Sequence, residues 1–107
     1  MFINKKKTVK SLDEKINLIQ TELVYLQRQA LSINSYIRLN VKNQFNSIEV
    51  DPLNKSSFKD CINIDEKINY FYIFPSAKTS EIMINCEIMN INYDLIIDNM
   101  GNVKLNG

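Results

Sequence analysis

The feature that most constrains this chain is an unbroken heptad pattern near its N-terminus. From residue 12 to residue 37 every position in 4-3 alternation is apolar, and neither Gly nor Pro interrupts the segment. The seam positions are Leu12, Ile16, Ile19, Leu23, Leu26, Ala30, Ile33 and Ile37. At 1.5 Å per residue the seam would run along about 39 Å of α-helix. The pattern is typical of a coiled coil, so we expect these residues to bind a helix of a protein partner, in a homo- or hetero-oligomer.

The same stripe also fits a helix that lies on the protein's own sheet. The regularity of the heptad over nearly four repeats favours the coiled coil.

A second apolar stripe on the same helix bears on the size of the assembly. It comprises Leu18, Val24, Tyr25 and Leu31. Because a two-stranded coil would leave this stripe in water, we expect a multi-helix bundle or a helix that is covered on two sides.

The residues before the heptad indicate where the helix begins. Ser11-Leu12-Asp13-Glu14 has the form of a capping box, in which Glu14 reaches back to the Ser11 amide. Two carboxylates in a first turn are also stabilised by the helix dipole. We therefore expect a basic disordered tail over residues 1–10 and a coiled-coil helix over residues 11–45.

Beyond the helix the apolar residues alternate with a period of two, which is typical of β-strands. The alternation covers residues 68–74, 82–88 and 91–97, before a turn around Gly101 and a short last strand. Its phase slips at Met89-Asn90, which indicates a tight turn or a bulge. We expect residues 46–107 to form a small antiparallel β-meander, a β head, that packs on the end of the helix. The predicted fold class is α+β.

One predicted strand carries a run of aromatic residues. Tyr70, Tyr72 and Phe74 alternate with Phe71 and Ile73, so both faces of the strand are apolar. We assign Tyr70 and Tyr72 to the face that the helix covers, because few Lys or Arg residues lie near them. The alternative is that Tyr70, Phe71 and Tyr72 stack on nucleic-acid bases, as the aromatic sheet faces of single-strand binders do.

The charges are distributed unevenly along the chain. Residues 1–45 contain eight Lys/Arg and three Asp/Glu, whereas residues 46–107 contain five and nine. Candidate anion contacts are Lys5, Lys6, Lys7 and Lys10. This lysine run, combined with the aromatic face, defines the alternative function of a small nucleic-acid-binding protein. A solvated tail is the favoured interpretation, because four lysines are few and the β head is acidic.

The composition argues against most enzyme chemistry. The chain contains no His, which excludes imidazole catalysis and histidine metal ligation. Its two cysteines are in no C-x-x-C pair, and its two glycines cannot build a phosphate-binding loop. A solvated rim explains the clustered carboxylates better than a metal site does; they are Asp60, Asp65, Glu66, Asp94 and Asp98. We expect a protein that is not an enzyme, without cofactor, metal or small-molecule substrate.

Two observations concern the location of the protein. The sequence contains no apolar run of 18 residues that could span a membrane. Its N-terminal segment also lacks the apolar core of a signal peptide. We expect an intracellular protein, cytoplasmic or nuclear, in which Cys61 and Cys86 are reduced and structural.

The order of coiled coil, short linker and β-meander resembles the small subunits of the outer-kinetochore microtubule-binding complex. The similarity lies in the spacing of Tyr70-Phe71-Tyr72-Ile73-Phe74, Ile82-Met83-Ile84 and Tyr93-Asp94-Leu95. It implies an RWD-like head. Such heads usually continue into a C-terminal helix, which is not predicted after the last strand of this sequence. The expected function is that of a non-catalytic assembly subunit of kinetochore type, which oligomerises through its coiled coil and docks other proteins on its β head.

Overall fold

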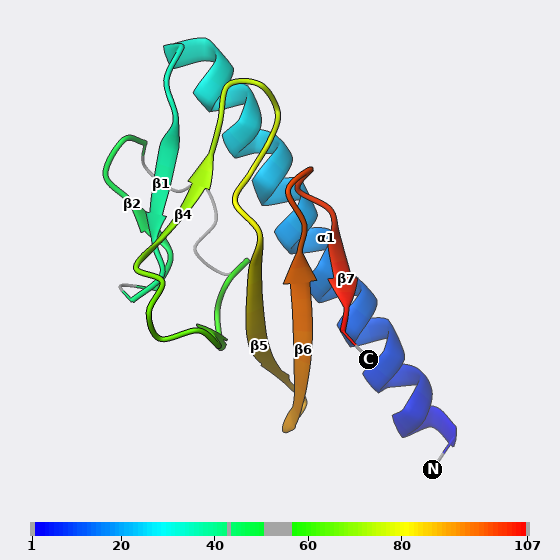
Figure 1. Cartoon of the computed structure of the whole chain (residues 1–107). Helices are drawn as coiled ribbons and strands as arrows, with labels where there is room; N and C mark the ends of the chain where they lie inside the picture. The colour runs from blue at the N-terminus through cyan, green and yellow to red at the C-terminus, as the bar shows by residue number, and fades with distance from the viewer. Residues whose placement is uncertain (1, 43, 51–56, 107) are drawn as a thin grey trace.

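The computed structural model has one long helix along one side of two antiparallel sheets (Figure 1). It describes residues 2–42, 44–50 and 57–106, with the backbone alone for residues 2–10. The helix, α1, spans Phe2–Ile33. The strands are β1 (Ile37–Asn40), β2 (Asn46–Ser47), β3 (Cys61–Asn63), β4 (Tyr70–Ile73), β5 (Ile82–Ile88), β6 (Ile91–Ile97) and β7 (Val103–Leu105). The α+β class with antiparallel strands is confirmed.

The strands form two sheets and not the single meander that was expected. One sheet has the order β2-β1-β4 and the other has the order β3-β5-β6-β7. Thr79 joins them, because its amide and its hydroxyl donate to the carbonyls of Asn99 and Asp98 at 2.9 and 2.8 Å. Thr79 also forms an isolated antiparallel bridge with Ile73 of β4. A buried polar side chain thus connects the edge of one sheet to the turn that follows β6.

The β5–β6 hairpin confirms the phase slip seen in the sequence. Ile88 pairs with Ile91, so Met89 and Asn90 alone form the turn. Both turn residues have positive φ, 52° and 65°. This is the conformation of a two-residue type I′ turn, whose twist matches that of the flanking strands.

The heptad seam contacts the protein's own sheets and not a second helix. Leu12, Ile19, Leu23, Leu26 and Ala30 are buried in one core with residues of both sheets, and Ile16 packs against it. Ile33 is exposed, and Ile37 belongs to β1. The expected use of the seam for a partner helix is therefore corrected. An apolar stripe that repeats every 3.5 residues can pack on a sheet as well as on a second helix. In this chain it packs on the protein's own sheets.

The helix has different limits from those expected. It begins at Phe2, so residues 2–10 are helical and Ser11 lies inside the helix and not at its cap. It ends at Ile33, and Asn34 has a positive φ of 54°. The Ser35 amide donates to the Ala30 carbonyl at 3.1 Å, and the Asn34 amide donates to the Leu31 carbonyl at 3.2 Å. These two bonds form a Schellman motif, in which Asn tolerates the left-handed position.

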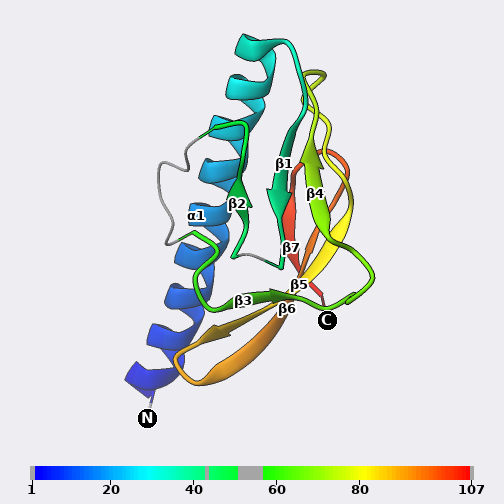
Figure 2. The same cartoon turned by 90° about the vertical axis from the view of Figure 1, so that its left-hand side faces the viewer.

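This early end places residues 37–40 in β1, between β2 and β4. The β head therefore begins before residue 46. The head also lies along most of the helix and not only at its end, as Figures 1 and 2 both show. The boundaries of 11–45 and 46–107 are corrected accordingly.

The two cysteines form a disulfide, contrary to the expectation that both are reduced. In the β3–β5 pairing Cys61 lies opposite Cys86, with their Cα atoms 4.0 Å apart. Cys86 is fully buried in the core, on the same face of β5 as the buried Ile84 and Ile88. A separation of 25 residues could not reveal this contact, because only the sheet register produces it.

Candidate functional site

The outer side of the β2-β1-β4 sheet carries the most distinctive surface of the described structure. Arg38 pairs with Tyr72 in the β1–β4 register, and Asn40 pairs with Tyr70. Side chains alternate across a strand, so these residues point away from the core, whereas Phe71 and Ile73 point into it and are fully buried. We call the following set the aromatic face: Tyr36, Arg38, Tyr70, Tyr72 and Phe74.

The orientation of β4 reverses the expected one. Tyr70 and Tyr72 were assigned to the covered side, and that assignment is wrong. Phe71 and Ile73 have no polar atoms in their side chains, so they enter the core without needing a hydrogen-bond partner. A buried tyrosine would need one for its hydroxyl.

Sequence reasoning missed Tyr36 and Arg38, because they fall in the segment that was expected to be helical. Asn34, a residue type that often ends helices, is the signal that could have found them.

The rings of the aromatic face touch one another. Tyr72 lies at the centre, with Tyr36 at 5.6 Å in an edge-to-face arrangement and Phe74 at 6.1 Å in a nearly parallel one. The Tyr70 ring lies 6.3 Å from the Tyr72 ring. Such arrangements hold rings in place and contribute about 0.5–1.5 kcal/mol per pair beyond area burial. The face is therefore ordered before anything binds to it.

Arg38 is also held in place. Its Cζ lies 5.4 Å from the centre of the Tyr70 ring, and its Nε donates to Glu49 Oε1 at 2.9 Å. The hydrogen bond to Glu49 raises the pKa of Arg38 above its ordinary value. Burial alone would raise the pKa of Glu49, but the hydrogen bonds from the Arg38 amide and guanidinium outweigh it, and the pKa of Glu49 is lowered. The cation of the face is thus fixed and already neutralised.

The exposed area of the face is large for isolated surface rings. Tyr36, Tyr70 and Phe74 are 44%, 38% and 37% exposed. With about 200 Å² per aromatic residue, these three rings present on the order of 250 Å² to solvent. A standard protein interface buries about 800 Å² on each partner. An interface of standard size centred on this face would therefore need further contacts around it.

Three of the four residues of the second apolar stripe are exposed, whereas Tyr25 is half-buried and packs against the core. Leu18, Val24 and Leu31 are not covered by the described part of the chain. A shallow pocket of about 420 Å³ lies on this side, lined by Asn17, Gln20, Thr21, Val24, Tyr25 and Arg28. The described part of the chain thus covers the helix on one side, whereas the sequence indicated a multi-helix bundle or a helix covered on two sides.

The candidate anion contacts lie outside the described side chains. The backbone at Lys5, Lys6, Lys7 and Lys10 is helical, and the structure does not place their side chains. The acidic residues make local contacts instead of forming a cluster. Asp98 accepts from the Met100 and Asn102 amides, both at 2.9 Å, and the Asn102 amide is the main cause of its lowered pKa.

The part of the chain that the structure describes contains no group of three or more His, Cys, Asp or Glu side chains that could hold a metal ion. Among the same residues, no helix is long and apolar enough to cross a membrane. An intracellular location and a non-catalytic role stay predictions.

Comparison with known proteins returned no match to any family model, curated protein or solved structure. The resemblance to outer-kinetochore subunits therefore stays a prediction.

Proposed function

We propose that this chain is a non-catalytic assembly subunit that docks a protein partner on the aromatic face of its β head. The observation that carries the proposal is a cluster of mutually ordered, exposed rings around an arginine that is held by Glu49. Tyrosine and arginine are enriched among the residues that dominate binding energy at protein interfaces. The helix seam has no part in this proposal, because the protein's own sheets cover it.

Rigidity favours the aromatic face over the helix stripe as the docking surface. A side chain that is already ordered loses less conformational entropy on binding. Tyr72 is held by its neighbours on both sides, and its amide donates to Ser80 Oγ at 3.0 Å. Leu18 and Leu31 stand apart on the helix and offer apolar area without specific geometry.

The alternative function, binding of single-stranded nucleic acid, has one observation in its favour. The parallel rings of Tyr72 and Phe74, and the Tyr70 ring with Arg38 over it, could stack on bases. Binding of a phosphate backbone also needs uncompensated positive charge. Arg38 is the described cation in contact with the rings, and Glu49 neutralises it. A protein partner suits this neutral, apolar surface better.

Two double variants test the proposal in the full-length chain. Tyr36→Ser/Tyr70→Ser removes two exposed rings of the face, and Leu18→Ser/Leu31→Ser removes two exposed leucines of the helix stripe as a matched control. Both should keep the parent's circular dichroism, since all four side chains are exposed. The partner is identified by affinity purification from the host and mixed with each purified variant. We expect the face variant to weaken its binding at least about tenfold, and the control to leave it within about twofold.

The nucleic-acid alternative is measured on the same proteins. A fluorescent single-stranded oligonucleotide is titrated at low and at moderate salt. Binding by the parent that is lost in the face variant and weakens steeply with salt would replace our proposal by the alternative. If both variants lose affinity for the protein partner equally, the aromatic face is not the docking surface.

A further inference from the structure

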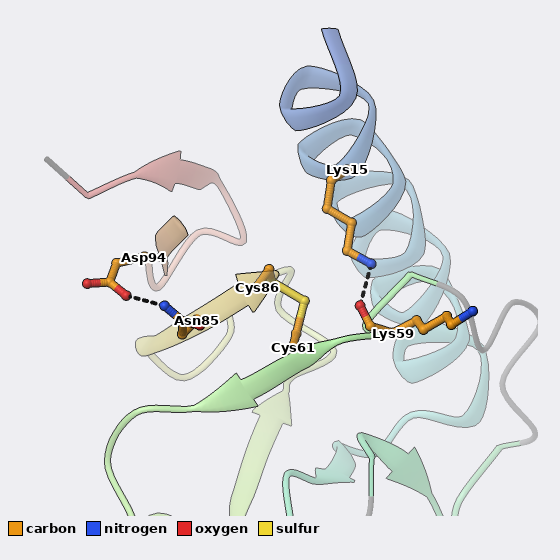
Figure 3. Close-up of a disulfide and its surroundings, with 6 residues drawn as sticks. All are labelled: Lys15, Lys59, Cys61, Asn85, Cys86 and Asp94. Atoms are coloured by element: carbon orange, nitrogen blue, oxygen red, sulfur yellow. Dashed lines mark hydrogen bonds between the residues drawn. A yellow bond between two sulfur atoms is a disulfide. The ribbon is translucent and has the colours of Figure 1, made fainter. Parts of the chain in front are cut away.

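One segment of the chain, residues 57–64, bridges three parts of the fold; we call it the strap. Ser57 Oγ donates to Glu22 of α1 at 3.2 Å, and both residues are buried. The ring of Phe58 stacks on that of Phe45 at 4.4 Å, on the connection between β1 and β2. Lys15 Nζ of α1 donates to the Lys59 carbonyl at 2.8 Å (Figure 3). The first half of the strap is thus attached to the helix and to the β2-β1-β4 sheet.

The second half of the strap is β3, which is attached to the other sheet. The Glu87 amide donates to the Asp60 carbonyl at 3.0 Å, and the Ile64 amide donates to the Met83 carbonyl at 3.1 Å. β3 is an edge strand of three residues, with β5 as its one neighbour in the sheet. A short edge strand gains little from main-chain bonds alone. The Cys61–Cys86 disulfide is the covalent bond that fixes it to β5 (Figure 3).

The two cysteine residues differ in their exposure to solvent. Cys86 is 0% exposed and lies on β5, between β3 and β6. Cys61 is 8% exposed and lies on the edge strand. A pocket of about 440 Å³ reaches it, lined by Gln44, Phe58, Lys59, Asp60, Cys61 and Ile62. Cys61 is thus the cysteine that borders a pocket, whereas Cys86 is fully buried on a strand between two others.

We propose that the Cys61–Cys86 disulfide is a redox-controlled latch, which a thiol reductant opens at Cys61 to release the strap from β5. The incoming thiolate attacks Cys61 Sγ, the S–S bond breaks, and Cys86 leaves as a thiolate that takes up a proton. A second thiol of the reductant attacks the mixed disulfide and releases Cys61. The net change converts the disulfide and two thiols into two cysteine thiols and one disulfide of the reductant. Two electrons pass to the protein, and the reverse reaction with a disulfide oxidant closes the latch.

Opening the latch has a local consequence. Without the disulfide β3 keeps only its main-chain bonds to β5, so the strap should separate more often from the second sheet. The β5–β6 hairpin should persist, because its pairing from Ile82–Ile97 to Ile88–Ile91 is made by main-chain bonds that do not involve the disulfide. The inference is independent of the aromatic face, which lies on the other sheet.

Amide hydrogen exchange of the full chain, oxidised and then reduced with a phosphine, tests the latch. The reporting amides are Ile64 and Glu87, which join the strap to β5. Control amides are Val41 and Asp98, which donate to Asn69 and Asn102 elsewhere in the fold. Reduction should accelerate the reporters by about tenfold or more and change the controls by less than about twofold. Unchanged reporters would show that the disulfide controls nothing, and equal acceleration of all four would show that it holds the whole fold and is no latch.

Two single-cysteine variants test the order of attack. Cys86→Ala leaves Cys61 alone, and Cys61→Ala leaves Cys86 alone; each is reacted with an aromatic disulfide reagent. Cys61 should react at least about tenfold faster than Cys86, since access controls thiol reactivity. Circular dichroism of both variants monitors folding. Equal rates in two folded variants, or a faster Cys86, would overturn attack at Cys61. If either variant is unfolded, the parent protein is treated instead with a limiting amount of a monothiol. Peptide mass spectrometry should then find the mixed disulfide on Cys61, and a mixed disulfide on Cys86 would overturn attack at Cys61.

Discussion

Glu49 accepts two hydrogen bonds from a single residue, Arg38. Its Oε1 lies 2.9 Å from the guanidinium Nε, and its Oε2 lies 3.1 Å from the backbone amide of the same arginine. One carboxylate therefore fixes both the side chain of Arg38 and the β1 backbone on which it stands. Ser47 Oγ donates to the same carboxylate at 3.3 Å and so connects β2 to it. We therefore expect the position of Arg38 in the aromatic face to depend on the ionisation of Glu49.

A pH dependence follows from this relationship. The pKa of Glu49 is lowered in the folded chain, from its ordinary value of 4.5. Its contribution to stability is therefore complete above pH 4.5 and is lost as the pH falls through the lower, folded value. Glu49→Gln should lose about 1 kcal/mol of stability at pH 7 and a smaller amount at pH 3, because pH 3 lies below the ordinary pKa of 4.5. Denaturant unfolding at both pH values checks this, with Glu87→Gln as an exposed control. Equal losses for Glu49→Gln at pH 7 and pH 3 would show that its ionisation has no structural role.

The opposite faces of the helix should respond differently to the same truncation. Leu23 is 1% exposed and Leu31 is 65% exposed. Leu23→Ala should cost about 2–5 kcal/mol through the cavity it leaves, whereas Leu31→Ala should stay within about 0.5 kcal/mol. Chemical denaturation measures both, and sedimentation measures their mass. A Leu23→Ala protein that stays equally stable but dissociates into smaller species would restore the coiled-coil interpretation of the seam.

Two neighbours on β4 report which way the strand faces. Phe71 is fully buried and Tyr70 belongs to the aromatic face. Phe71→Ala should destabilise the chain by about 3–5 kcal/mol. Tyr70→Ala should cost less than about 1 kcal/mol, since it loses only contacts with exposed rings. Denaturant unfolding midpoints of the two variants measure this difference. A larger loss of stability for Tyr70→Ala than for Phe71→Ala would mean that β4 presents its other face to the core.

The β head should not fold without the helix. β2 and β4 both pair with β1, so a fragment that begins at residue 46 lacks the central strand of that sheet. A fragment that begins at residue 32 regains β1 but still lacks the buried helix residues from Leu12 to Ala30. We expect both fragments to lack tertiary structure, because sheets of this size are marginal without a covering layer. Dispersed amide NMR spectra from either fragment would show that helix and head are independent.

The sequence by itself determined the elements whose pattern is local. An apolar residue at every seam position from 12 to 30 can form one stripe only on a helix, and that helix is present. The alternation through β5 and β6, with its slip at Met89-Asn90, indicated two strands with a tight turn or a bulge, and the structure has two strands and the turn. Local periodicity is a property of neighbouring residues, so it can be read without knowing what lies opposite.

Only the tertiary structure decided what each of these patterns faces. The seam could cover a helix or a sheet, and the presence of two apolar sheets in the same chain settled the choice. Both faces of β4 carry apolar residues, so the pairing of β4 with β1 decided that Phe71 and not Tyr70 enters the core. Cys61 and Cys86 meet because the β3–β5 register places them opposite each other. In all three cases the free energy depends on contacts between residues far apart in the chain, and a local pattern does not contain them.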